Sequence, residues 1–499
     1  MQQLIGRMHN WRGILFVAFL ARIVAVIFSP GYGMHDDHFL IIESSASWVD
    51  GYDYNNWLPW SPNNAGHPEG HSFTYVGLNF FYFYTMKMLG IADPKVLMFL
   101  NRLLHAFASM AVVHFGMRIT EKLSDRVTAL RVGWFLALLW ILPFVSVRNL
   151  VEMVAAPLLV YGTWLILKSE RRRNFLFSGM VIGLSVSFRY QVGVFAIGMG
   201  LYFLFTRRWI PLLLFSLGNA LVFGLTQGLV DYLIWGYPFA ELMGYVTYNL
   251  KEGTHYLPNQ NYLMYFLVLT GCFFVPLGLI LGFGFFRSAR KYAVLFVPTF
   301  AFLLFHTIYP NRQERFILSI LPFFLILGVL GYQLLKETPF KQKIWRISLI
   351  SFWVLNIPFL LFASTMYSKR SRVEAMYSLY GKKEKIDLIL LEGSASGRVS
   401  MLPKFYNKCW SAAQVERTDS LADLRVNPAL DYPYIFFFDE KDLDKRVLSY
   451  KKLYPKMQLE FKSYPSLVDQ LLRWLNPRNA NEYIEVWKTN YTPVNTVRK

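Results

Sequence analysis

Long apolar blocks separated by short basic loops are the feature that most constrains how this chain can fold. At least ten of the blocks approach the ~20 consecutive apolar residues that an α-helix needs to cross the hydrocarbon core of a bilayer. The chain is 54% hydrophobic and only 17% charged, whereas an ordinary soluble domain carries about 25% charged residues. The sequence therefore predicts a polytopic α-helical membrane protein.

The basic residues indicate how the helices are oriented. The formal net charge is +19, and Lys and Arg gather in short loops between apolar blocks. The clearest basic loops are at residues 171–173, 207–208, 287–291 and 336–346. Such loops are expected on the cytoplasmic side, so the charge favours a topological explanation over nucleic-acid binding. The alternative is that these residues are solvated helix caps that carry no information about orientation.

With the N-terminus in the cytoplasm, the alternation predicts roughly eleven transmembrane helices. The predicted spans are residues 13–28, 96–119, 132–147, 151–167, 175–188, 193–205, 211–230, 262–285, 293–309, 316–335 and 347–364. Residues 73–89 are also apolar, but counting them as a span would place every later basic loop outside. We therefore expect an interfacial or re-entrant helix there, which suits its many Tyr and Phe residues.

This topology predicts two external regions. The first is a long loop at residues 30–94, which contains acidic residues and histidines but no Lys or Arg before Lys87. The second follows the last span and combines strand-like runs at 386–391 and 434–438 with a helical pattern at 467–474. We expect a transmembrane domain at residues 1–364 and a small external α/β domain at residues 365–499.

The polar motif His35-Asp36-Asp37-His38 directly follows the first span. Ionised groups at the edge of a membrane need water, a partner or a cation. On an extended turn the two aspartate side chains would point apart, so that one can bind or catalyse while the other orients it. Such a carboxylate can serve as a general base or hold a divalent cation. The plainer alternative is a pair of solvated loop acids.

Several arginines lie at the predicted outer ends of spans. They are Arg148, Arg189, Arg312 and Arg315. A forked guanidinium suits bidentate contacts with phosphate oxygens. The alternatives are arginines that extend toward lipid headgroups or that pair with nearby acids, such as Arg148 with Glu152 and Arg315 with Glu314.

The segment 231–255 is dense in aromatic and hydrogen-bonding residues, which suits sugar binding. Its candidates are Asp231, Trp235, Asn249 and His255. The alternative for any single aromatic is a place in the interfacial Trp and Tyr belt. The sequence shows no Walker loop, dinucleotide fingerprint or zinc motif, so a soluble nucleotide donor is not indicated.

Motifs in chain order resemble the lipid-linked mannosyltransferases of glycosyltransferase family 22, which include the dolichol-linked oligosaccharide and glycosylphosphatidylinositol enzymes. His35-Asp36-Asp37-His38 resembles the family's His-Pro-Asp-Glu motif, Arg148-Asn149-Leu150 resembles its Arg-Thr-Leu motif, and Phe188-Arg189 resembles its Arg-Pro-Thr segment. Asp231-Tyr232, Trp235-Gly236 and Asn249 follow the family's pattern of Asp-Ser, Tyr-Gly and Asn. Gly253-Thr254-His255 resembles the family's Gly-Thr-His-Pro motif, and residues 311–316 resemble its His-Lys-Glu-Glu-Arg-Phe motif. The similarity covers roughly residues 10–365 and is weaker in the remainder.

The resemblance implies a GT-C fold and a membrane glycosyltransferase, most simply a mannosyltransferase. Such an enzyme moves a sugar with inversion from a polyprenyl-phosphate donor to a hydroxyl of a glycan or glycolipid at the outer face. Asp37 takes the position of the family's base. Asp36 replaces a proline and His38 a glutamate, which leaves open whether Asp36 shares the work.

The resemblance also implies roles for the other candidates. Arg189, Arg312, Arg315 and Arg148 would bind the donor phosphate, and His35, His38, Asp231, Trp235, Asn249, His255 and Glu314 would bind substrate. No cofactor is required by this chemistry, although a divalent cation is compatible with it. The expected partners are the lipid-linked donor, the acceptor and membrane lipids, without nucleic acid.

We expect the bacterial inner membrane with a periplasmic site, and alternatively the endoplasmic reticulum with a lumenal site. Two other functions fit parts of the pattern. One is another GT-C transfer, of glucose, an amino sugar or an oligosaccharide. The other is a transporter or flippase for a lipid-linked sugar, which would need acids at the membrane midplane and related repeats in its two halves.

Overall fold

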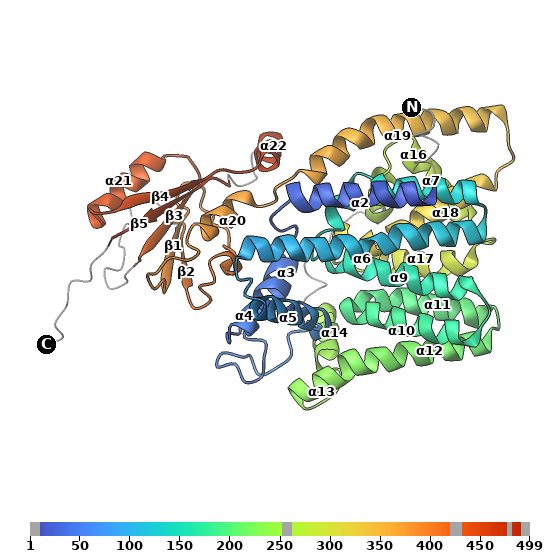
Figure 1. Cartoon of the computed structure of the whole chain (residues 1–499), viewed down its shortest axis with the longest axis horizontal. Helices are drawn as coiled ribbons and strands as arrows, with labels where there is room; N and C mark the ends of the chain where they lie inside the picture. The colour runs from blue at the N-terminus through green and yellow to red at the C-terminus, as the bar shows by residue number, and fades with distance from the viewer. Residues whose placement is uncertain (1–9, 252–261, 420–431, 477–481, 491–499) are drawn as a thin grey trace. The chain divides into compact units, whose positions relative to one another are not determined.

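The computed structural model describes residues 10–251, 262–419, 432–476 and 482–490 (Figure 1). The chain divides into two compact units. The membrane unit comprises residues 1–27, 55–78 and 100–365, and the sheet unit comprises residues 28–54, 79–99 and 366–499. Each unit is described by itself. The predicted division at residues 364 and 365 stays a prediction.

The membrane unit is built from helices. They are α2 (Trp11–Phe28), α6 (Pro94–Leu123), α7 (Arg126–Leu138), α8 (Ile141–Val145), α9 (Val151–Lys168), α10 (Arg172–Phe188), η2 (Tyr190–Val192), α11 (Gly193–Phe205), α12 (Trp209–Phe223), η3 (Gly224–Gly228), α13 (Leu229–Trp235), α14 (Ala240–Lys251), α15 (Met264–Gly271), α16 (Leu277–Arg287), α17 (Ala293–Ile308), η4 (Glu314–Ile320), α18 (Leu321–Gln333) and α19 (Pro339–Ser364).

By length and apolar composition, six helical stretches in the described residues can cross a membrane. They are Trp11–Phe28, Pro94–Leu123, Val151–Lys168, Trp209–Trp235, Glu314–Gln333 and Pro339–Ser364. Shorter apolar helices occupy Tyr190–Phe205, Leu277–Arg287 and Ala293–Ile308. The predicted membrane-helical class agrees with this architecture, whereas the predicted number of roughly eleven spans is not confirmed.

Close helix contacts hold this unit together. Helix α10 packs between α9 and α12, and α16 packs on α18 (Figure 1). The contact of α10 with α12 depends on glycine, because a Cβ atom at Gly179 would lie 2.0 Å from the carbonyl oxygen of Phe215. Small residues at such a crossing allow the two backbones to approach closely.

Two predicted spans are interrupted by irregular backbone. The span expected at 132–147 is divided between α7 and α8, where the Asn356 side chain accepts from Trp140 N and donates to Leu138 O. The amide thereby satisfies backbone groups that the end of a helix leaves free. The span expected at 262–285 is likewise divided between α15 and α16.

The last helix of the membrane unit begins earlier than predicted. We expected a span from residue 347, and α19 begins at Pro339. Thr338 accepts a hydrogen bond from Lys341 N, and Pro339 occupies the first turn, both of which are typical of a helix start. The apolar helix expected at residues 73–89 is present as α5 (Phe73–Met88).

The sheet unit contains a five-stranded sheet in the order β2-β1-β3-β5-β4. Its strands are β1 (Leu388–Glu392), β2 (Ala413–Arg417), β3 (Tyr434–Phe438), β4 (Gln458–Ser463) and β5 (Ile484–Lys488). Its helices are α3 (His35–Asp37), η1 (His38–Glu43), α4 (Ser44–Val49), α20 (Arg370–Tyr377), η5 (Lys404–Tyr406), α21 (Leu443–Leu453) and α22 (Leu467–Leu475). Strands β2, β1 and β3 are parallel, whereas β5 runs antiparallel to β3 and β4. The predicted small C-terminal α/β region is therefore present.

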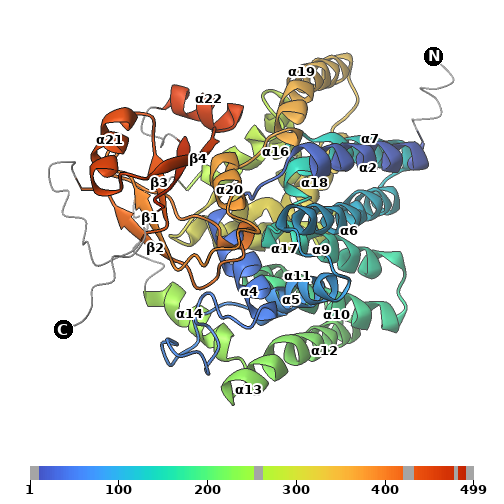
Figure 2. The same cartoon turned by 60° about the vertical axis from the view of Figure 1, so that its left-hand side comes forward.

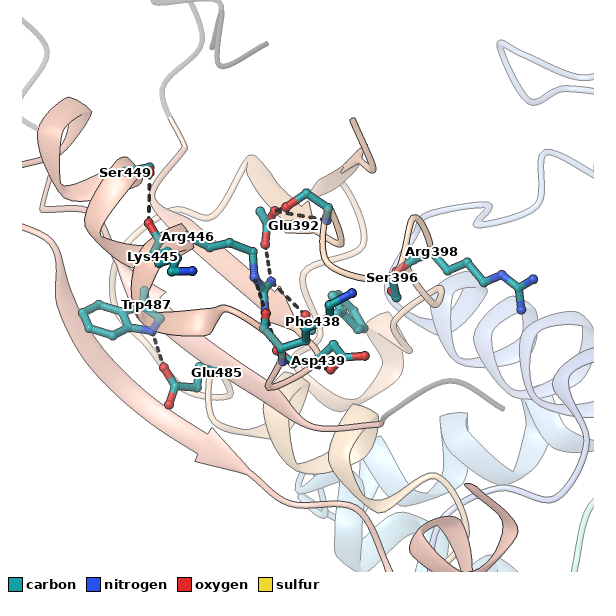
Figure 3. A network of polar contacts seen from close by, with 12 residues as sticks. Glu392, Ser396, Arg398, Phe438, Asp439, Lys445, Arg446, Ser449, Glu485 and Trp487 are labelled. Atoms are coloured by element: carbon teal, nitrogen blue, oxygen red, sulfur yellow. Dashed lines mark hydrogen bonds and ion pairs between the residues drawn. The ribbon is translucent and has the colours of Figure 1, made fainter. Parts of the chain in front are cut away.

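Helix α21 lies alongside the strands (Figure 2), and its Val447 and Tyr450 pack with β3 residues such as Phe437. One end of the sheet is fixed by a buried ion pair between Arg446 and Glu392, with Nη1 2.5 Å from Oε2. Arg446 also donates to the carbonyl oxygens of Phe438 and Asp439 (Figure 3). A buried charge needs such pairing and hydrogen bonding.

Candidate functional site

The acidic motif forms a helical turn rather than the extended turn that we expected. Met34 is extended, His35–Asp37 is helical, and the chain continues into the π-helix η1. The expectation was wrong because the turn is continuous with η1, a feature without a local sequence signature. Consecutive helical residues are still about 100° apart, and here Asp36 is exposed whereas Asp37 is only 7% exposed.

The ring of His38 is enclosed within the sheet unit. It stacks on Tyr32 with ring centroids 4.4 Å apart and on Tyr406 at 5.8 Å. Its Nε2 lies 3.2 Å from Oε1 of Glu43. These residues are five positions apart, the spacing of hydrogen bonds in a π-helix, so η1 aligns the two side chains. Burial raises the pKa of the neighbouring Tyr32 to about 12.

Glu43 was not among the predicted site residues. Its side chain is fully buried, and both carboxylate oxygens accept from the backbone N–H of Phe405, at 3.0 and 2.9 Å. It therefore joins the segment that follows Asp37 to the turn η5. In the sequence, the signal for Glu43 was an acid that directly follows an apolar run at residues 39–42. Its partner Phe405 is far away in the sequence, so this signal does not identify the contact.

Two of the predicted arginines share one carboxylate in the membrane unit. Glu152, fully buried in the first turn of α9, lies 3.0 Å from Nη2 of Arg189 and 3.8 Å from Nε of Arg315. Arg315 Nε also donates to Oε1 of Gln313 at 2.8 Å, and the Arg189 guanidinium lies 4.7 Å from the Phe316 ring centroid. Two guanidinium groups facing one carboxylate leave a local excess of positive charge.

The other two predicted arginines are buried near aromatic rings. The Arg148 guanidinium lies 4.1 Å from the ring centroid of Phe144. That of Arg312 lies 4.4 Å from the Tyr262 ring centroid, and its Nε donates to Tyr309 O at 3.1 Å. Cation–π contacts of this kind stabilise a guanidinium by roughly 0.5–2 kcal/mol.

Neighbouring charged residues of the 309–316 segment differ in their exposure to solvent. Glu314 is exposed, whereas Arg315 is buried. Tyr309 connects this segment to Asn249, because its hydroxyl donates to Asn249 O at 2.6 Å and to Oδ1 at 3.2 Å. Asn249 is thereby held against the segment that carries Arg312. His255 lies outside the described residues, as do Gly253 and Thr254.

Asp231 and Trp235 belong to a polar network that sequence reasoning did not anticipate. Asp231 accepts from Gln227 Nε2 at 2.7 Å and from Glu241 N at 2.9 Å. The Trp235 indole donates to Oε1 of Glu241 at 2.8 Å. The second oxygen of Glu241 accepts from the backbone of residues 70 and 71, at 2.8 and 3.0 Å. Burial raises the pKa of Glu241 to about 7.

This network joins residues 70 and 71 to helices α13 and α14. Gly70 has φ +83°, and a Cβ atom there would lie 2.7 Å from Tyr245 N, so only glycine fits the close approach.

In the part of the chain that the structure describes, no group of three or more His, Cys, Asp or Glu side chains could hold a metal ion.

Comparison with known proteins adds a family and a fold. The model of the Alg9-like mannosyltransferase family matches residues 14–387, and no curated protein sequence matches the chain. ArnT from Cupriavidus metallidurans in the apo state is similar in structure, with a TM-score of 0.61 at 13% identity, covering 95% of this chain and 97% of that one.

Two further solved structures are similar to this chain. ArnT bound to undecaprenyl phosphate has a TM-score of 0.61 at 12% identity, with 95% and 97% of the two chains covered. The Archaeoglobus fulgidus oligosaccharyltransferase has a TM-score of 0.49 at 11% identity, with 88% of this chain and 69% of that chain covered. At these identities, the likeness to ArnT shows a shared GT-C fold.

Proposed function

This chain belongs to the Alg9-like mannosyltransferase family, and we propose that it moves mannose from a polyprenyl-phosphate donor to a hydroxyl of a glycan or glycolipid acceptor. The chain is a glycosyltransferase and an integral membrane protein of GT-C fold. The proposal concerns the sugar, the donor, the acceptor and the side. We place the reaction at the outer face of a bacterial inner membrane, with the endoplasmic reticulum lumen as the alternative.

The observation that carries the proposal is the arrangement of Arg189 and Arg315 around the buried Glu152. When the glycosidic bond to the carrier breaks, negative charge develops on the departing phosphate. Preorganised guanidinium groups stabilise such charge without having to reorient. ArnT, which is similar in structure, binds undecaprenyl phosphate, and we propose a lipid carrier of that class here. Arg312 and Arg148 would supply further contacts to the phosphate.

We assign the base to Asp37. The acceptor oxygen attacks the anomeric carbon as its proton passes to the Asp37 carboxylate, and the bond from that carbon to the phosphate oxygen breaks with inversion. The lipid phosphate leaves with the electron pair. The resemblance places Asp37 at the position of the family's base, and Asp37 is also the more enclosed of the two acids, since it is buried whereas Asp36 is exposed.

The remaining predicted residues keep proposed roles in substrate binding. They are His35, His38, Asp231, Trp235, Asn249, His255 and Glu314, whereas Asp36 keeps its proposed share in catalysis beside Asp37. The reaction as written needs no cofactor, because a lipid phosphate is already a good leaving group. A divalent cation beside the phosphate would be compatible with it.

The test is transfer of radiolabelled mannose from polyprenyl-phosphate mannose in membranes that contain the protein. Asp37→Asn should lower the rate by about a hundredfold or more, the contribution expected of a general base, whereas Asp36→Asn should lower it less. Glu69→Gln, an exposed acid of the same loop, is the matched control. Wild-type rates for Asp37→Asn would show that the base is misassigned. Competition with polyprenyl-phosphate glucose tests the sugar.

A further inference from the structure

A groove of about 770 Å³ lies between α7 and α19 of the membrane unit. It contains none of the residues assigned to the reaction. Its lining includes Arg131 and Trp134 from α7 and Trp345 and Arg346 from α19, with aliphatic side chains farther along both helices. Arg131 lies in the first half of α7 and Arg346 in the first half of α19, so both arginines lie toward the starts of their helices.

Polarity changes in the same direction along both walls. On α7 the order is Arg131, Trp134 and Leu138, and on α19 it is Arg346, Leu349 and Trp353. Seven residues of helix correspond to about 10 Å. Each wall therefore runs from a cation to apolar side chains about 10 Å farther along the helix. This profile matches a phospholipid, whose charged headgroup is joined to acyl chains that extend into the bilayer.

The two arginines are available to an external anion. Among the described residues, neither Arg131 nor Arg346 makes a hydrogen bond or an ion pair, and both side chains are exposed. Arg131 interacts electrostatically with one acid, Glu337. The pKa of Glu337 is lowered chiefly by its hydrogen bond with Lys341. That carboxylate is thus already paired, and the groove mouth carries two cations without a matching acid.

We propose that this groove binds one anionic diacyl phospholipid from the leaflet on the side of the basic loops. The lipid phosphate lies between Arg131 and Arg346, and an acyl chain lies along Leu138, Leu349 and Trp353. The indoles of Trp134 and Trp345 occupy the interfacial depth that tryptophan prefers. Basic pockets between transmembrane helices recognise anionic headgroups in this way.

Native mass spectrometry of the detergent-purified full chain tests the headgroup. We expect one tightly bound phosphatidylglycerol per chain and much weaker binding of phosphatidylcholine with the same acyl chains. The double variant Arg131→Gln/Arg346→Gln should weaken phosphatidylglycerol binding about 30-fold, at about fivefold for each basic residue near a lipid phosphate. The control Arg171→Gln/Arg172→Gln removes two exposed arginines from another basic loop and should bind as wild type.

The acyl chain has its own test. Leu349→Trp narrows the groove without changing its charge, and it should weaken phosphatidylglycerol binding while the protein keeps its elution volume. Brominated phosphatidylglycerol should quench tryptophan fluorescence in the wild type and quench it less in Trp345→Phe/Trp353→Phe. The proposal is overturned if the double arginine variant binds phosphatidylglycerol like the wild type. It is also overturned if glycerol phosphate, which has no acyl chain, competes at equal concentration.

Discussion

Glu152 shows how one buried carboxylate can set the charge of the candidate phosphate site. Its contacts with Arg189 and Arg315 orient two guanidinium groups that would otherwise repel each other. The net positive charge that remains is the property that a departing phosphate requires. Glu152 is thus a positioning residue for the proposed reaction, because it acts through the arginines.

We predict that Glu152→Gln lowers both transfer activity and stability. Removing one partner of a buried ion pair costs about 3–5 kcal/mol, so thermal unfolding in detergent should occur at a clearly lower temperature. Glu121→Gln is the control, because Glu121 pairs with Arg118 at the surface, at 3.5 Å, and such pairs contribute about 0–1 kcal/mol. Equal unfolding temperatures for the two variants would contradict the assignment.

Glu241 predicts a pH dependence of stability. Burial raises its pKa from 4.5 to about 7, so between these values the folded protein holds a proton that the unfolded chain has released. Stability should therefore fall as pH rises from about 4.5 to about 7 and then level off. Thermal unfolding at pH 5 and pH 8 measures the difference. In Glu241→Gln this contribution should disappear, and an unchanged difference would assign it to other groups.

At the scale of elements, the π-helix η1 is the link between Asp37 and the C-terminal part of the sheet unit. This helix begins directly after Asp37 and ends at Glu43, and it aligns His38 with Glu43. The Glu43 carboxylate accepts a hydrogen bond from Phe405 N. A π-helix is rare and often marks a functional site. The turn η5 therefore supports the helix that carries the proposed base.

We predict that Glu43→Ala lowers kcat with little change in KM for the donor, because it loosens the support of Asp37 without removing a donor contact. Hydrogen exchange should increase at residues 404–406. Glu43→Gln keeps one acceptor oxygen for Phe405 N and should restore part of the rate. A variant Glu43→Ala with wild-type kcat would exclude this positioning role.

The elements differ in how far the sequence could predict them. Helices such as α9 and strands such as β3 followed from apolar patterns, because their burial depends on composition within a short window. The division of α7 from α8 depends on Asn356, and the anchoring of Glu43 depends on Phe405. Those partners lie more than 200 residues away in the sequence, so no local pattern contains them.

The candidate site was predictable to a similar degree. Arg189 and Arg315 were found because a cation at the end of an apolar span is conspicuous. Glu241 was missed because a single acid in a polar segment has no distinguishing pattern, and its partners Gly70 and His71 belong to a different loop. Asp231 was recognised as polar, but its hydrogen bond with Glu241 N could be seen only in the folded chain.

At the scale of the whole molecule, the proposed reaction depends on which side of the membrane each loop occupies. The predicted spans between the basic loop at 171–173 and the C-terminal region are odd in number, so these two regions should lie on opposite sides. The parity changes if a single short apolar helix, such as α16 or α17, is counted wrongly.

Cysteine labelling tests this topology. In a chain with Cys272 and Cys409 replaced by serine, Arg172→Cys and Ser396→Cys each introduce one thiol at an exposed position. In spheroplasts, a membrane-impermeant maleimide should label Ser396→Cys directly and Arg172→Cys only after permeabilisation. The reason is that positive loops remain cytoplasmic during insertion. Labelling of both positions from one side would mean that an apolar helix is miscounted, and the proposed outer location of the arginines would then be wrong as well.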